Sequence, residues 1–387
     1  MAAFLDVVNF LPVSSGTVDF VVASAVQGFQ TPASAGVVNG RTYKYRAESA
    51  DLSQWEVGEG TYNTSTNTLA RTTVLYNSLG TTAKINFSTI PQVGIVALKS
   101  DLISISEANS FTTTQQGQGR TNLGILGVPR EVLTANRTYY VRTDGSDSND
   151  GLANTAGGAF LTIQKAINIV SALDIGTYTV TMQVGAGTYT AGVSVTAPWV
   201  GSGTVEIVGD TTTPTNCVIS TTSAHCVTVS NAARISIKGF RLQTTTVGSC
   251  IIASSYGSVT LTGNMNFHTC ANFHLLAYGG TITSVGGNSY TITGNAAAHL
   301  YSAGTGSKLA VTSNTVTLTG TLTFSIAFAQ AETLSVILSY YSTFSGGTVT
   351  GTRYAAITNS IINTGGGGAS HYPGSVGGAT GSGGIYV

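Results

Sequence analysis

The carboxylates are the side chains with the clearest catalytic potential, because hydrolysis of a glycosidic bond normally needs two of them about 5 to 9.5 Å apart. After Asp210, this chain of 387 residues contains one acidic residue, Glu332. Glu206 and Asp210 are the other candidates, but the three residues between them also suit a surface turn. This scarcity favours a protein that is not an enzyme. A catalytic site between subunits, in which Glu332 faces another chain, is the alternative.

Two cysteines and two histidines recur about 25 residues apart, at Cys226, Cys250, His274 and His299. Zinc needs four ligands within about 2.3 Å of one centre. If these residues stack as strands in successive turns of a coil do, at about 4.8 Å, the outer two lie about 14 Å apart. We therefore expect no metal and no cofactor. The acidic segment DGSDSNDG (144–151) lacks the spacing of an EF-hand loop and predicts an Asx-rich turn.

The composition excludes several classes of partner. Charged residues make up 8% of the chain, and its 16 basic and 16 acidic residues cancel. No electrostatic field therefore attracts nucleic acid or an anionic membrane surface. Apolar residues reach 42%, which argues against disorder, and the abundance of Ser, Thr and Gly favours strands and turns over helices. The chain is thus expected to be ordered and all-β.

The chain is also expected to fold in a cytoplasm. Its N-terminus carries no basic stretch before the apolar residues, so no signal peptide is predicted. No apolar run approaches the length of about 18 residues that a membrane helix requires, so no membrane insertion is predicted. Without metal-like spacing, the four cysteines are expected to be buried free thiols.

An internal repeat is the strongest structural signal. Segments of similar pattern begin at residues 226, 250, 274, 299, 325 and 354, and two further sets of strand-like segments advance by about 25 residues in step with them. Three sets of strand-like segments that recur at the same interval predict a right-handed parallel β-helix with three strands per coil. The stack needs a cap at its first coil. Residues 160–174 predict this cap, because their apolar positions share one helical face after a possible N-cap at Thr162.

Three segments resemble parts of bacteriophage tail proteins. TYYVRTDGSDSNDG…AFLTIQKAI (138–167) resembles the opening of pectate-lyase-like β-helices in tailspikes and tail fibres. QWEVGEGTYNTSTNTLARTTVLYNS (54–78) is similar to an N-terminal module of tail fibre proteins, and TTQQGQGRTNLGIL (113–126) to their connector, with Gly117 and Gly119 where Ala is usual. The resemblance implies a tailspike or tail fibre protein that resides in the virion and is assembled in the host cytoplasm.

The resemblance also implies a division of the chain. Residues 1–100 form a small β domain that docks on other tail or baseplate proteins, and residues 101–137 form a partly helical connector. Residues 138–364 form the β-helix. The segment 365–387 is rich in Gly and is either a flexible tail or an ordered tip, at which His371, Tyr372 and Tyr386 stack on sugars of a receptor.

One column of the β-helix breaks the expected alternation of apolar and polar residues. We expect this column to face outward and to pack three parallel copies of the chain into a homotrimer. A register slipped by one residue, which exchanges the inner and outer faces, is the alternative. The predicted interface comprises Cys226, Thr228, Cys250, Ile252, His274, Leu276, His299, Tyr301, Ala327 and Tyr354.

These observations predict a structural and receptor-binding protein of a phage tail. Its β-helix presents a trimer to the host surface, where a polysaccharide is a possible partner. The alternative is a polysaccharide depolymerase, either a glycoside hydrolase or a lyase, with a site between subunits. The count of acidic residues favours the first function.

Overall fold

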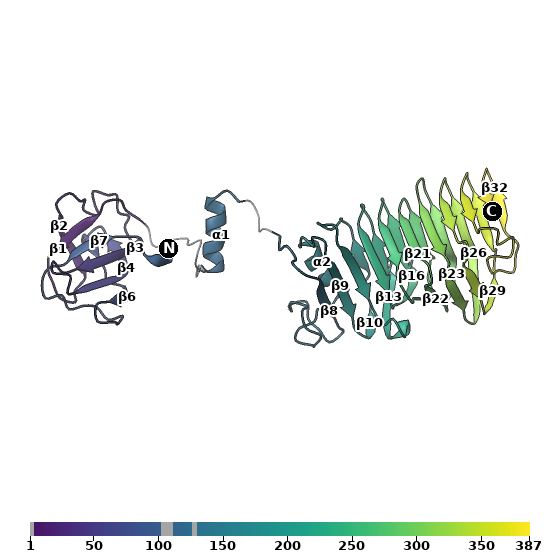
Figure 1. The fold of residues 1–387 in the computed structure, drawn as a ribbon, viewed down its shortest axis with the longest axis horizontal. Helices are drawn as coiled ribbons and strands as arrows, with labels where there is room; N and C mark the ends of the chain where they lie inside the picture. The colour runs from purple at the N-terminus through teal and green to yellow at the C-terminus, as the bar shows by residue number, and fades with distance from the viewer. Residues whose placement is uncertain (1–3, 102–110, 126–129) are drawn as a thin grey trace. The chain divides into compact units, whose positions relative to one another are not determined.

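The computed structural model describes residues 4–101, 111–125 and 130–387. The chain divides into two compact units, Met1–Gly127 and Val128–Val387 (Figure 1). The first unit is antiparallel and the second is a stack of parallel strands, so the all-β class is confirmed.

The first unit contains a seven-stranded sheet in the order β3-β7-β1-β2-β5-β4-β6, and an additional β3–β4 pairing joins it further. Its alternating strands bury one face in a core that includes Phe10, Tyr45 and Val93. The strands are β1 (Asn9–Pro12), β2 (Phe20–Ala25), β3 (Thr42–Glu48), β4 (Trp55–Asn63), β5 (Thr68–Leu69), β6 (Thr73–Asn77) and β7 (Gln92–Ile95).

A buried ion pair ties together the strands and loops of this unit. Glu56 on β4 and Arg71 after β5 have no exposed side-chain surface, and the guanidinium donates to both carboxylate oxygens. Glu56 also accepts from the Tyr45 hydroxyl at 2.9 Å and from the Ile85 amide at 2.8 Å. Arg71 donates further to the carbonyls of Gly16 and Ile85. The pair is therefore well supplied with hydrogen bonds, which a buried ion pair requires.

Two short helices lie outside the sheets at this end of the chain. The 3-10 helix η1 (Lys99–Asp101) follows β7, and α1 (Thr113–Asn122) lies in the predicted connector. A capping box between Thr112 and Gln115 starts α1, which buries no residue.

The second unit is a parallel β-helix of about eight coils of about 25 residues, which confirms the predicted fold. We call its three sheets faces 1, 2 and 3. Face 1 contains β8 (Arg137–Val141), β9 (Thr179–Val184), β12 (Thr204–Val208), β15 (Arg234–Lys238), β18 (Ser258–Leu261), β21 (Thr281–Val285), β24 (Lys308–Thr312), β27 (Val336–Leu338), β31 (Ile361–Asn363) and β33 (Ile385–Tyr386).

Face 2 contains β10 (Gly187–Tyr189), β13 (Cys217–Ser223), β16 (Arg241–Val247), β19 (Asn266–Phe267), β22 (Ser289–Ile292), β25 (Thr315–Leu318) and β28 (Thr343–Ser345). The 3-10 helix η2 (Pro214–Asn216) precedes β13. Face 3 contains β11 (Val193–Val195), β14 (Val227–Val229), β17 (Ile251–Ser254), β20 (Phe273–Tyr278), β23 (Ala296–Ala303), β26 (Thr321–Glu332), β29 (Thr348–Thr350), β30 (Tyr354–Ile357) and β32 (Ala379–Gly381).

The predicted stacking is confirmed for the central coils. Val227, Ile251, Leu275 and Leu300 pair in register from strand to strand, and all four side chains are buried in the interior. A ladder of apolar side chains at one position per coil thus forms the core, and the strand pairs satisfy the backbone polar groups beside it.

The predicted register fails from residue 325 onward. Tyr301 pairs with Gln330, which in turn pairs with Ala355, so Ala327 does not continue the column of Tyr301. The reason is that β26 is 12 residues long and the β23–β26 pairing shifts between Ala296 and Ala298. Such a shift moves the following residues out of phase with the repeat.

The capping helix is confirmed as α2 (Ile163–Ser171), which packs against β8, β9 and β11 of the first coils. Thr162 is its N-cap and accepts a hydrogen bond from the Lys165 amide. Asp147 in the acidic loop accepts from the amides of Leu161 and Thr162 and from the Thr162 hydroxyl. The acidic loop therefore positions the helix, as the predicted Asx-rich turn allows.

The last 23 residues form a further coil, so the flexible-tail interpretation is wrong. β32 pairs with β30 on face 3, and β33 pairs with β31 on face 1. The Tyr386 ring stacks on Tyr354 at 3.5 Å between centroids. Gly-rich composition alone favours disorder, but here the preceding coil supplies strand partners and a stacking surface for the segment.

Candidate functional site

The outward column of face 3 is the candidate site, and its position is set by the strand register. Thr228, Ile252, Leu276, Tyr301 and Gln330 pair in sequence from β14 to β26, and each side chain points away from the interior. All of these residues are buried or half-buried rather than exposed. Three adjacent members of this column, Ile252, Leu276 and Tyr301, are apolar or aromatic, and such a run on an otherwise hydroxyl-rich coil is suited to contact with another protein surface.

An aromatic pair and a carboxylate lie beside this column towards the C-terminal coils. The Phe273 and Tyr301 rings stack at 4.0 Å between centroids with 19° between their planes. The Tyr301 hydroxyl donates to Glu332 Oε1 at 2.6 Å, and the Gln330 amide donates to Glu332 Oε2 at 3.1 Å. Burial, together with the hydrogen bond to the Glu332 carboxylate, raises the pKa of Tyr301. Glu332 therefore holds the aromatic pair in place instead of presenting two free oxygens.

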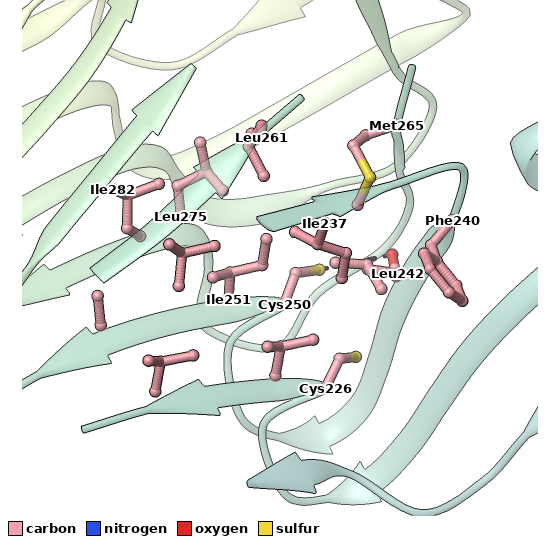
Figure 2. Close-up of a cluster of buried hydrophobic side chains, with 14 of the residues drawn as sticks. Cys226, Ile237, Phe240, Leu242, Cys250, Ile251, Leu261, Met265, Leu275 and Ile282 are labelled. Carbon is pink, nitrogen blue, oxygen red and sulfur yellow. Dashed lines mark hydrogen bonds between the residues drawn. The ribbon is translucent and has the colours of Figure 1, made fainter. Parts of the chain in front are cut away.

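Six of the predicted interface side chains are buried within the chain and not exposed on its surface, which corrects that part of the prediction. Figure 2 shows Cys226 and Cys250 among apolar side chains that include Ile237 and Leu242. Cys226 and Cys250 directly precede β14 and β17, whereas His274 and His299 lie within β20 and β23 and interrupt the alternation there, since each is followed by a second buried residue. The six buried residues are Cys226, Cys250, His274, His299, Ala327 and Tyr354.

The two buried histidines form a hydrogen-bonded chain that fixes their tautomers. His274 Nε2 lies 2.9 Å from the carbonyl of His268 and must donate to it. His274 Nδ1 then accepts from His299 Nδ1 at 3.1 Å, and His299 Nε2 accepts from the Tyr290 hydroxyl at 2.8 Å. Burial lowers the pKa of His274 to about 3 and that of His299 well below its usual value. Both rings are therefore neutral and satisfied inside the core.

The structure gives Glu206 and Asp210 separate local partners. Glu206 Oε2 lies 3.6 Å from Lys238 Nζ, with both side chains partly exposed. Asp210 accepts hydrogen bonds from the amides of Thr212 and Thr213 and from the Asn216 side chain, and these bonds lower its pKa. The Asp210 carboxylate thus organises the turn that leads to η2. Among the described residues, no group of three or more His, Cys, Asp and Glu side chains could hold a metal ion.

The predicted receptor residues of the last coil have structural partners. Tyr372 is fully buried, and its hydroxyl lies 2.6 Å from Ser339 Oγ, so its ring cannot contact a receptor. His371 Nε2 lies 3.0 Å from the same oxygen. Tyr386 is half-buried on Tyr354, and its hydroxyl donates to the Gly368 carbonyl. The tip prediction is therefore wrong for Tyr372, while His371 and Tyr386 keep partial exposure.

Face 1 carries a groove that the sequence did not reveal. It has a volume of about 330 Å³. Trp199 and the hydroxyl residues of three neighbouring coils line it together with Arg234. Trp199 and Arg234 are 35 residues apart in the chain, and the only sequence signal was that Trp199 is one of two tryptophans.

No described helix has the length and apolar character needed to cross a membrane. No protein-family model, curated protein or solved structure matches this chain. Functional conclusions therefore depend on the geometry of the faces described above.

Proposed function

We propose that this chain is a structural and receptor-binding spike or fibre protein of a bacteriophage tail. In the proposal, the N-terminal unit docks on other tail or baseplate proteins, and the β-helix meets polysaccharide on the host surface. The protein is assembled in the host cytoplasm and resides in the virion. Support comes from a capped β-helix that follows a separate antiparallel unit, and from the three segments that resemble tail proteins.

The observation that carries the proposal is the apolar outward column of face 3. Ile252, Leu276 and Tyr301 follow one another on adjacent coils of face 3, whereas the outward column of face 1 carries hydroxyl residues at Ser236, Thr260 and Thr283. Burial of about 400 Å² of such a surface contributes on the order of 10 kcal/mol before the costs of association. We propose that three parallel copies pack along this column, as a stiff spike requires.

Sedimentation equilibrium of the full chain tests this packing. We expect a mass of about 119 kDa, three times the 39.5 kDa of one chain. The Leu276→Asp variant is expected to sediment as a monomer, because a carboxylate would be buried without a partner at the interface. Thr283→Asp places the same charge on the outer side of face 1 and should leave the trimer intact. A wild-type monomer would overturn the proposed packing.

The depolymerase alternative is tested by incubating the protein with purified bacterial capsule or lipopolysaccharide. We expect no release of oligosaccharide, because both oxygens of Glu332 are hydrogen-bonded to Tyr301 and Gln330. The Glu332→Gln variant should therefore behave as the wild-type protein does. Release that Glu332→Gln abolishes, and that the matched variant Glu206→Gln retains, would make the alternative the better function.

A further inference from the structure

The groove on face 1 is built from a rigid loop and three strands. Its wall is the segment that carries Trp199, whose indole N–H donates to the Arg234 carbonyl at 2.6 Å. The amides of Ser202 and Gly203 donate to the Gly176 carbonyl at 2.7 and 2.9 Å. A Cβ atom at Gly203 would lie 2.0 Å from the Tyr178 carbonyl oxygen, so only glycine allows this close approach. The wall is thus positioned before any ligand arrives.

The floor of the groove is a set of hydroxyl groups on adjacent strands. Thr204 lies on β12, Ser236 on β15, and Ser258 and Thr260 on β18, and all four line the groove. Their outward positions follow from the register, in which Arg234 pairs with Ser258 and Ser236 pairs with Thr260. Hydroxyl groups at strand spacing can donate to and accept from the hydroxyls of a sugar ring.

The Arg234 guanidinium is exposed at this groove and has no ion pair or hydrogen bond among the described residues. The other arginines of the β-helix unit each have a described partner. Three of them are held by side chains: Arg137 by Glu131, Arg142 by Asp144 and Arg241 by Asn266. The remaining two, Arg130 and Arg353, donate to backbone carbonyls. Among the described arginines of this unit, Arg234 is therefore the one whose guanidinium is available to bind a ligand.

We infer that this groove binds one sugar residue that carries a single negative charge, a carboxylate or a sulfate ester, within a host polysaccharide. The inference rests on the proposed receptor-binding function and names the chemistry of its ligand. Arg234 is the one charged residue that lines the groove, so a monoanion is neutralised there while a more highly charged group is not. The sugar ring packs on the Trp199 indole, and its hydroxyls bond to the floor.

Calorimetric titration of the full chain tests the inference with oligogalacturonate, its methyl ester and a sulfated carrageenan oligosaccharide. We expect an anionic oligosaccharide to bind at least about tenfold more tightly than the neutral ester, because only the anion pairs with Arg234. Comparison of the carboxylated and sulfated probes distinguishes the two sources of charge. Preference for either over the ester supports the inference, whereas equal affinities, or no binding of either anion, overturn it.

Variants separate this groove from other surfaces. Arg234→Ala and Trp199→Ala are each expected to weaken binding of the anionic probe at least about tenfold. Lys308→Ala removes an exposed cation three coils further along the same column and should leave binding unchanged. An equal loss in Lys308→Ala would assign the effect to general charge and overturn the site.

Adsorption to bacterial cells separates this inference from the proposed function. If the Arg234→Ala variant adsorbs to cells as well as the wild-type protein does, the spike function stands and the groove is overturned as a binding site. Wild-type protein that is monomeric and adsorbs to no cell of a bacterial panel, yet prefers the anionic oligosaccharide, would overturn the spike function and support the groove.

Discussion

Replacement of Arg71 by alanine is expected to lower the free energy of unfolding of the N-terminal unit by about 3 to 5 kcal/mol. The substitution leaves the Glu56 carboxylate buried without its counter-ion. It also removes the guanidinium that lies over the rings of Phe20 and Phe87, at 4.9 and 5.6 Å from their centroids. Because Tyr45 and Ile85 still donate to Glu56, the carboxylate keeps hydrogen bonds but no charge partner.

Urea unfolding followed by tryptophan fluorescence measures this loss. A Trp199→Phe background leaves Trp55, on β4 of the N-terminal unit, as the reporter. The control is the double variant Glu56→Gln, Arg71→Met, which removes both charges and should lose less than Arg71→Ala alone. Equal losses in the two variants would show that the unpaired carboxylate is not the source of the destabilisation.

Acidification from pH 7 to pH 5 is expected to destabilise the β-helix unit by about 3 to 4 kcal/mol through His274 and His299. Burial holds the pKa of His274 at about 3 and lowers that of His299 well below its usual value, whereas both are about 6.5 in the unfolded chain. Between these values the unfolded state binds more protons than the folded state. The contribution of these two histidines to the free energy of unfolding is therefore fully present above about pH 6.5 and is lost as the pH falls below that value.

The structural reason is that the chain of hydrogen bonds has no place for another proton. Protonation of His274 Nδ1 breaks its bond from His299, and protonation of His299 Nε2 forces the Tyr290 hydroxyl to accept, which leaves the hydroxyl proton without the acceptor it has in the neutral state. Asp144 and Asp210 contribute little in this range, because hydrogen bonds lower their pKa values and both groups stay ionised.

Urea midpoints at pH 7, 6 and 5, followed by circular dichroism, measure the slope. The variant His274→Phe, His299→Phe, Tyr290→Phe replaces the network by apolar rings and should reduce the average slope between pH 7 and pH 5 by about 1 kcal/mol per pH unit for each histidine removed. The matched variant His225→Phe replaces a half-buried histidine elsewhere and should reduce the slope less. An unchanged slope in the triple variant would contradict the assignment.

The repeat in the sequence was sufficient to predict the coil, its three strands and the stacking of residues 226 to 300. Apolar residues that recur at a fixed interval are buried efficiently when the chain forms stacked coils. Each strand then pairs with its equivalent in the next coil, and the same position of each coil faces the core. The capping helix was also predictable, because its apolar face and its N-cap are local features. The scarcity of carboxylates in the β-helix is likewise evident from the sequence alone.

Three features depended on contacts between coils and could not be predicted from the chain alone. Cys226 and His274 lie inside although each is followed by another buried residue, so the simple alternation of inner and outer residues is interrupted at these positions. Residues 365–387 are ordered because the preceding coil offers strand partners that composition does not reveal. Trp199 and Arg234 meet because stacking places successive coils side by side. Local pattern sets which strands form, whereas the packing of neighbouring coils decides which side chains reach the surface together.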